Sequence, residues 1–156
     1  MDVRAAPVWL RLLAGLLDLV PVAALAAAGC RAWFAFHPPH LPPRYWNVLD
    51  YAVDVLNRQP RIAAVPLVAF AAAWLAWETA WLRGLGATPI ARLAGLRVVT
   101  SEGGRVGWGR ALARSALSLV LGAAAGIGPA WALPSPRRRM LHDILTGCQV
   151  VRGPLP

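Results

Sequence analysis

Arg11 and Asp18 place two charged side chains in the otherwise apolar stretch WLRLLAGLLDLV. Asp18 follows Arg11 by seven positions, so both would lie on nearly the same face of a helix, about two turns apart. Arg11 is close enough to the end of the stretch for its guanidinium to reach lipid headgroups. Asp18 lies near the middle, where an aspartate in lipid costs roughly 2.5 to 3.5 kcal/mol. We therefore expect Asp18 to face protein or water, either to bind a cation or proton or to pair with a donor on another helix.

Two further charges occur in apolar runs. Pro21 lacks an N–H and leaves the carbonyl of Leu17 without its helical partner, which makes the surroundings of Asp18 more polar. Glu78 lies one turn from the end of a second run, among tryptophans, and a solvated interfacial position is the alternative for it. Arg114 lies in a third run and is a natural counter-charge for either carboxylate. We predict an intramembrane polar site formed by Asp18, Glu78 and Arg114.

The sequence offers little support for catalysis or metal binding. Its three His and two Cys show no CxxC or HExxH spacing. His142 and Asp143 are adjacent and would point in different directions on a helix. Because no nucleophile, base and orienting group occur in motif spacing, we predict no catalytic residues, no metal, no cofactor and no enzymatic activity. An enzyme acting on lipid is the weakest alternative.

Composition indicates a membrane protein. Hydrophobic residues make up 58% of the 156 positions and charged residues only 15%. The net charge is +9, and all sixteen basic residues are Arg. This charge favours anionic lipid headgroups or an acidic partner, with nucleic acid the weaker interpretation.

The hydropathy pattern predicts a single domain over 1–156, an all-α membrane protein with a small surface β-hairpin. Two runs are long enough for transmembrane helices, and a third either spans the bilayer or re-enters. Between the first two, the apolar residues Tyr45, Leu49, Val53 and Leu56 recur at helical spacing, which predicts an amphipathic surface helix. The expected elements are helix 1 over 8–30, the surface helix over 44–57, helix 2 over 62–82, the hairpin over 95–107, helical segment 3 over 109–133, and a C-terminal amphipathic helix and strand over 137–152.

The third run leaves two topologies open. If it crosses fully, the sixteen arginines divide evenly, eight on each side. If it bends back at GIGP, the division becomes twelve against four, which the positive-inside rule prefers. We favour the re-entrant form, and pairing of CQVV with LRVV, which needs both segments on one side, would support it.

A cleaved leader is an alternative for the first run. Arg4, the apolar residues and LAAAGC ending at Cys30 resemble a lipoprotein signal peptide. Asp2, the central Asp18, and Ala27 where Leu is usual argue against it. We expect the run to remain as a transmembrane helix.

Three stretches carry a family resemblance: PVWLRLLAGLLDLV, TPIARLAGLRVVTSEGG and RRRMLHDILTGCQVVR. In this order they resemble the RDD family of small integral membrane proteins over nearly the whole chain. The family is named for one Arg and two Asp, which the resemblance assigns to Arg11, Asp18 and Asp143. Where the family usually has Thr-Pro-Gly-Lys, this chain has Ile90 and Ala91 in place of the last two residues, so a role for that lysine does not carry over. The resemblance implies transport of an unspecified ligand, with sodium/proton exchange for some members.

Two functional hypotheses follow. The first is transport of an ion or small solute through the polar site around Asp18, in a homo-oligomer or with a partner membrane protein, because two or three helices seldom enclose a pathway. The second is a noncatalytic accessory or scaffold subunit. Either would lie in the bacterial inner membrane with a cytoplasmic N-terminus. We predict that a basic group contacts anionic headgroups or a partner, namely Arg137, Arg138, Arg139 and His142.

Overall fold

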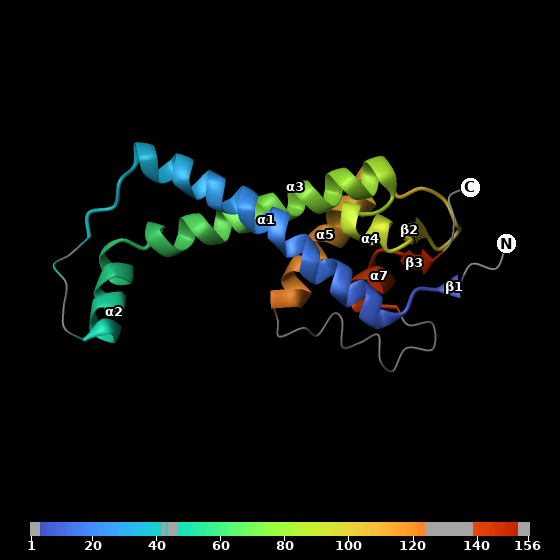
Figure 1. Cartoon of the computed structure of the whole chain (residues 1–156), viewed down its shortest axis with the longest axis horizontal. Coiled ribbons are helices and arrows are strands. Elements are labelled where there is room, and N and C mark those ends of the chain that lie inside the picture. The colour runs from blue at the N-terminus through green and yellow to red at the C-terminus, as the bar shows by residue number, and fades with distance from the viewer. Residues whose placement is uncertain (1–3, 42, 44–46, 124–138, 153–156) are drawn as a thin grey trace. The chain divides into compact units, whose positions relative to one another are not determined.

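The computed structural model describes residues 4–41, 43, 47–123 and 139–152. Their elements follow the order shown in Figure 1: β1 Arg4–Ala5, α1 Val8–Phe36, α2 Val48–Arg58, α3 Arg61–Leu85, α4 Pro89–Leu93, β2 Leu96–Thr100, α5 Trp108–Ala123, α7 Leu141–Leu145 and β3 Cys148–Arg152. The described residues are mostly helical, with one small antiparallel sheet.

Among the residues that the structure describes, α1 and α3 are the two helices whose length and apolarity suffice to cross a membrane. They have 29 and 25 residues, and their most apolar windows have mean hydropathies of 2.0 and 1.6. Only 22% and 11% of those windows is buried within the chain. A core helix of a soluble protein would be mostly covered, so the exposed apolar surface of both helices fits lipid contact better. The prediction of two long apolar helices is confirmed.

The chain forms two compact units, Met1–Val20 with Trp74–Pro156 and Pro21–Ala73. The second unit contains α2 and the adjoining parts of α1 and α3. In this unit α2 begins at the cap Asn47, whose side chain accepts from the Leu49 N–H. Leu49, Val53 and Leu56 are exposed, as the predicted amphipathic surface helix requires, while Tyr45 lies outside the described residues.

The first unit is organised around a three-stranded antiparallel sheet of order β1-β3-β2. β2 pairs with β3 in a register that places Val98 opposite Val150, and β1 pairs Ala5 with Val151. Gly147 ends the turn after α7 with φ 64°, a left-handed conformation that favours glycine, and so leads the chain into β3. CQVV therefore pairs with LRVV, the arrangement that would support the re-entrant topology.

The predicted hairpin over 95–107 is wrong in its partner. After β2 the chain turns at Ser101–Gly104, where the Gly103 N–H donates to the Thr100 carbonyl, and then continues to α5 without a second strand. The β-branched residues did mark a strand, but its hydrogen bonds go to β3, which lies far along the sequence.

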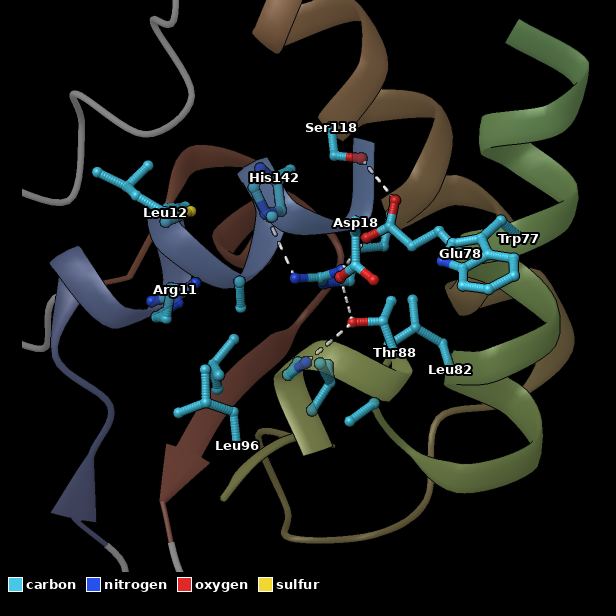
Figure 2. A pocket seen from close by; sticks show the side chains of 18 of the residues that line it. Arg11, Leu12, Asp18, Trp77, Glu78, Leu82, Thr88, Leu96, Ser118 and His142 are labelled. Atoms are coloured by element: carbon cyan, nitrogen blue, oxygen red, sulfur yellow. Dashed lines mark hydrogen bonds and ion pairs between the residues drawn. The ribbon is translucent and has the colours of Figure 1, made fainter. Parts of the chain in front are cut away.

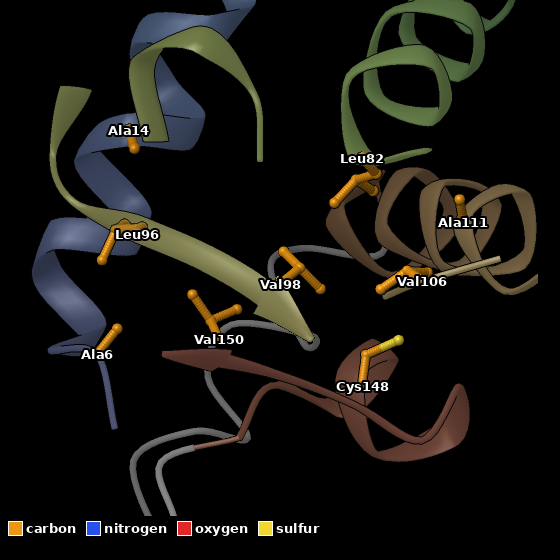
Figure 3. Packing of buried hydrophobic residues seen from close by; sticks show 9 residues of the cluster. All are labelled: Ala6, Ala14, Leu82, Leu96, Val98, Val106, Ala111, Cys148 and Val150. Atoms are coloured by element: carbon orange, nitrogen blue, oxygen red, sulfur yellow. The ribbon is translucent and has the colours of Figure 1, made fainter. Parts of the chain in front are cut away.

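A small apolar core packs on one face of the sheet. Burial alternates along β2 and β3, so Leu96, Val98, Cys148 and Val150 point to the same side. They pack with Leu82 and with small residues such as Ala14 from α1 and Ala111 from α5 (Figure 3). This core fixes the amino-terminal part of α1 and the carboxyl-terminal part of α3 beside α5 and the sheet. Only the first part of the third apolar run, α5, is described, and the GIGP turn lies outside the described residues.

Candidate functional site

A chain of buried ion pairs crosses the first unit. Asp143, on α7, is fully buried and accepts from two arginines: Nη2 of Arg11 contacts its Oδ2, and Nε of Arg114 lies 3.0 Å from its Oδ1. Nη1 of Arg114 in turn lies 2.5 Å from Oε1 of Glu78 on α3. The order of the chain is therefore Arg11, Asp143, Arg114 and Glu78, and it joins α1, α7, α5 and α3.

Hydrogen bonds extend this ion-pair chain at the Glu78 end. The Ser118 hydroxyl donates to Oε2 of Glu78 at 2.8 Å, and the indole N–H of Trp74 donates to the Ser118 oxygen at 3.2 Å. Both carboxylate oxygens of Glu78 thus have a donor. The ion pair and the hydrogen bonds thus offset part of the cost of burying this carboxylate.

Electrostatics at the α7 end keep Asp143 charged and His142 neutral. Burial opposes ionisation of Asp143, but the positive charges of Arg114 and Arg11 outweigh it and lower the pKa of this carboxyl. Burial, followed by the charge of Arg114, lowers the pKa of His142 to about 4. At neutral pH the imidazole therefore carries no charge, and it adds nothing to the charge balance of the ion-pair chain.

Asp18 lies near this chain without joining it. Its Oδ2 accepts a 2.5 Å hydrogen bond from the hydroxyl of Thr88, which also caps α4 by accepting from the Ala91 N–H. The indole N–H of Trp77 interacts with the Asp18 carboxylate, although the contact falls outside strict hydrogen-bond geometry. Asp18 is only 5% exposed. A buried polar group with incomplete hydrogen bonding costs about 1–3 kcal/mol, and more when it is charged, so the burial of Asp18 is only partly compensated.

Asp18, Glu78 and Trp77 border one cavity of about 340 Å³ (Figure 2). Its walls come from the amino-terminal part of α1, the carboxyl-terminal part of α3, α4, α5 and the sheet. Most of the wall is apolar, with Leu12, Leu16 and Leu82 among the lining residues. Figure 2 shows the carboxylate of Asp18 between Trp77 and Glu78 on one side and Thr88 on the other.

Asp18 is the cavity carboxylate outside the ion-pair chain. The two positive charges of Arg11 and Arg114 are matched by the two negative charges of Asp143 and Glu78. Among the salt bridges of the described residues, none involves Asp18, and none involves Arg97, a partly exposed arginine that also borders the cavity. Asp18 is thus a buried carboxylate without a salt bridge in the described part of the chain.

The residues predicted for the polar site do border one cavity, but their pairing differs from the simplest expectation. Arg114 pairs with Glu78 and Asp143, and Asp18 receives its hydrogen bond from Thr88. Glu78 is buried, which disfavours the solvated alternative considered for it. The sequence did not single out Thr88 as a partner, although a Thr before Pro is a recognisable helix cap, and its role beside Asp18 depends on the fold.

The predicted headgroup or partner contact is only partly described. His142 is 6% exposed and lies inside the cluster, at 3.5 Å from Arg114. Arg139 donates to the side chain of Gln149 at 3.0 Å. Arg137 and Arg138 lie outside the described residues.

These features define a small, mostly helical protein with two helices able to span a membrane and a buried cluster of ion pairs beside an apolar cavity. The model of the RDD family matches residues 5–147. The chain belongs to the RDD family, and the resemblance seen in its sequence is confirmed. No curated protein and no solved structure matches the chain.

Proposed function

We propose that the chain is a non-enzymatic integral protein of the bacterial inner membrane, with α1 and α3 crossing the bilayer and the N-terminus in the cytoplasm. The sheet supports this placement, because β1, β2 and β3 hydrogen-bond to one another and must lie on the same side of a membrane. α1 and α3 lie between β1 and β2, and two crossings return the chain to its starting side.

The same reasoning applies to the third apolar run. β2 precedes it and β3 follows it, yet the two strands are paired along their full length. The ion pair between Arg114 on α5 and Asp143 on α7 ties the two ends together again. These contacts support the re-entrant topology, which we propose for this run with its twelve arginines on the cytoplasmic side.

For the activity, we infer binding and exchange of a cation or proton at Asp18, as part of a transport function. The observation that carries this inference is the carboxylate outside the ion pairs: Asp18 is buried in α1, borders the cavity and forms no salt bridge among the described residues. A buried carboxylate that neither pairs nor leaves the membrane segment is a binding site by default. Two crossing helices do not enclose a pathway, so a second copy or a partner membrane protein completes it.

Thr88 supports this chemistry by holding one oxygen of Asp18. Its hydroxyl donates to Oδ2 and so fixes the orientation of the carboxylate at the edge of the cavity. Because Pro89 and the cap bond to Ala91 fix the start of α4, the hydroxyl is already oriented before a ligand arrives. Binding and release then change the charge of one atom without breaking the ion-pair chain.

The test is flux in proteoliposomes that contain the purified full-length protein. A sodium gradient is imposed, and the internal pH is followed with a trapped fluorescent dye. We expect Asp18→Asn to insert normally and to abolish sodium-dependent proton movement, whereas Asp50→Asn, a change of the same type on the exposed α2, should leave it intact. Equal flux in wild type and Asp18→Asn would reject the proposal, and so would wild-type vesicles that show no flux.

A second candidate is a noncatalytic accessory or scaffold subunit, which the ion-pair chain itself favours. Arg11, Asp143, Arg114 and Glu78 connect four helices, an arrangement suited to holding a fixed shape for a partner. In this case, replacing Arg137, Arg138 and Arg139 with Gln should remove a co-purifying membrane protein, and the isolated subunit should show no flux at all.

A further inference from the structure

The cavity beside Asp18 is larger than a proton or a bare metal ion requires. Its volume of about 340 Å³ lies in the range of sites for small organic molecules, roughly 300–1,000 Å³. The size of the cavity therefore leaves room for a ligand larger than an inorganic ion.

The walls combine apolar surface with aromatic rings. Leu12 and Leu16 of α1 and Leu82 of α3 supply hydrocarbon, while Trp74 and Trp77 present indoles. Both rings are held in place: Trp74 donates to Ser118, and Trp77 packs edge-on against Trp81 with ring centroids 5.5 Å apart. The face of an indole attracts a positive charge, most strongly where water is excluded.

The charged side chains of the walls favour a positive ligand. Arg11 and Arg114 are engaged by Asp143 and Glu78, so their charge is already neutralised. Arg97 also borders the cavity, but its side chain is partly exposed, so solvent screens it. Asp18 remains as a buried carboxylate without a salt bridge among the described residues, and it borders the same cavity as the two indoles. A cation in the buried part of the cavity would find this carboxylate as its partner, whereas an anion would be repelled by it.

We propose that this cavity binds an amphipathic organic cation, with its ammonium group beside the carboxylate of Asp18 and its apolar body against the leucines and the indoles. The inference deepens the proposed transport function by naming the class of substrate, and it rests on that proposal only for what happens after binding. The proton and the organic cation compete for the same carboxylate, so each would displace the other.

Binding can be measured directly with benzyltrimethylammonium, which carries a permanent charge and an aromatic body. Full-length protein in lipid nanodiscs is dialysed to equilibrium against the radiolabelled cation, and empty nanodiscs give the background from partitioning into lipid. We expect saturable binding to the wild type and a loss of about tenfold or more in Asp18→Asn, the ratio set by removing one charged partner. Trp77→Leu should weaken binding by about threefold, the value of an exposed cation–π contact. Asp50→Asn should bind like the wild type.

Competition makes the charge requirement explicit. Neopentylbenzene has the same shape without the charge, and it should fail to displace the labelled cation. The inference is overturned if the wild type shows no saturable binding, if the neutral analogue competes equally, or if Asp18→Asn binds as tightly as the wild type. If Asp18→Asn does not insert, two other measurements still test the inference. Unchanged affinity of Trp77→Leu for the labelled cation would contradict the assigned site, and so would full displacement of the cation by neopentylbenzene.

The two proposals fail separately. Sodium-dependent proton flux that requires Asp18, without saturable cation binding, removes the organic cation and leaves proton exchange. Saturable binding that requires Asp18, without flux of either species, removes transport and leaves a binding site. Flux of the labelled cation against a proton gradient, lost in Asp18→Asn and retained in Asp50→Asn, supports both.

Discussion

Asp143→Asn tests the ion-pair chain most directly. The substitution keeps the size of the side chain but removes the negative charge that Arg11 and Arg114 share, and Asp143 is 0% exposed, so water cannot replace it. Arg114 retains its salt bridge with Glu78, whereas Arg11 loses its salt bridge with Asp143. The amide N–H of Asn would also face a guanidinium N–H, and two donors cannot form a hydrogen bond with each other.

The expected cost follows from this geometry. Removing one member of a buried ion pair costs about 3–5 kcal/mol, because the remaining charge is left uncompensated. For a chain of this size, about 2–4 °C of melting temperature is lost per kcal/mol, which gives a drop of about 6–20 °C. Asp18→Asn should behave in the opposite way. It removes a carboxylate that has no positive partner among the described residues and keeps an acceptor for Thr88, so its stability should stay within about 1 kcal/mol of the wild type or rise.

Thermal unfolding in detergent micelles, followed by the fluorescence of the eight tryptophans, measures both variants in one assay. Asp50→Asn on the exposed α2 controls for the chemistry of the substitution. An Asp143→Asn protein as stable as the wild type would refute the ion-pair chain, and an Asp18→Asn protein as unstable as Asp143→Asn would refute the claim that Asp18 lies outside it.

Two further predictions concern side chains of the site, and a third concerns the membrane topology. Because burial lowers the pKa of His142 to about 4, the unfolded state binds more protons than the folded state between pH 6.5 and 4. The free energy of unfolding should therefore fall by about 3 kcal/mol as the pH falls through this window. Denaturation curves at pH 7 and pH 4 would measure this fall, and it should be smaller in His142→Gln. Thr88→Val removes both the α4 cap and the donor to Asp18 and should lower the unfolding free energy by about 1–2 kcal/mol, whereas Thr88→Ser should not, as the same melting assay would report. Single cysteines at Ser101 and Arg152 should be labelled from the same side of the membrane and one at Asn57 from the other, and labelling of Ser101 and Arg152 from opposite sides would contradict the re-entrant topology.

Hydropathy located the long helices because it depends on composition alone. The first helix continues to Phe36, beyond the predicted end at residue 30. The prediction stopped where Arg31 ends the apolar run, but a charge does not interrupt a helix. The helix ends shortly before Pro38, because proline restricts the residue that precedes it and cannot continue the hydrogen-bond pattern. Apolarity and helicity therefore end at different residues.

The sheet could be predicted only in part, because strand pairing depends on segments far apart in the sequence. The β-branched residues around Val98 and Val99 indicated a strand, and the neighbouring glycines suggested a local hairpin. The observed partner β3 is separated from β2 by α5 and α7. Local composition shows that a strand forms, but it carries little information about which edge the strand will join.

The sequence identified single charged residues of the candidate site but not the distant residues that pair with them. Asp18, Glu78 and Arg114 stood out because charges are costly in apolar segments, and that reasoning needs no partner. Asp143 drew less attention, since it follows a short polar segment and an exposed aspartate there would cost nothing. Its importance arises from a contact with Arg11 across 132 positions, which no spacing rule can supply.

The two family aspartates therefore differ in what compensates their burial. Asp143 is charged and doubly paired, so any exchange of its proton would break the contacts that join α1, α5 and α7. Asp18 is held by a neutral hydroxyl and has one oxygen toward the cavity, so its charge can change while those contacts persist. A transport site needs this separation, because a group that holds helices together cannot also release its partner in every cycle. The opposite responses expected of Asp143→Asn and Asp18→Asn, stability lost in one and ligand binding lost in the other, are the measurable form of that division.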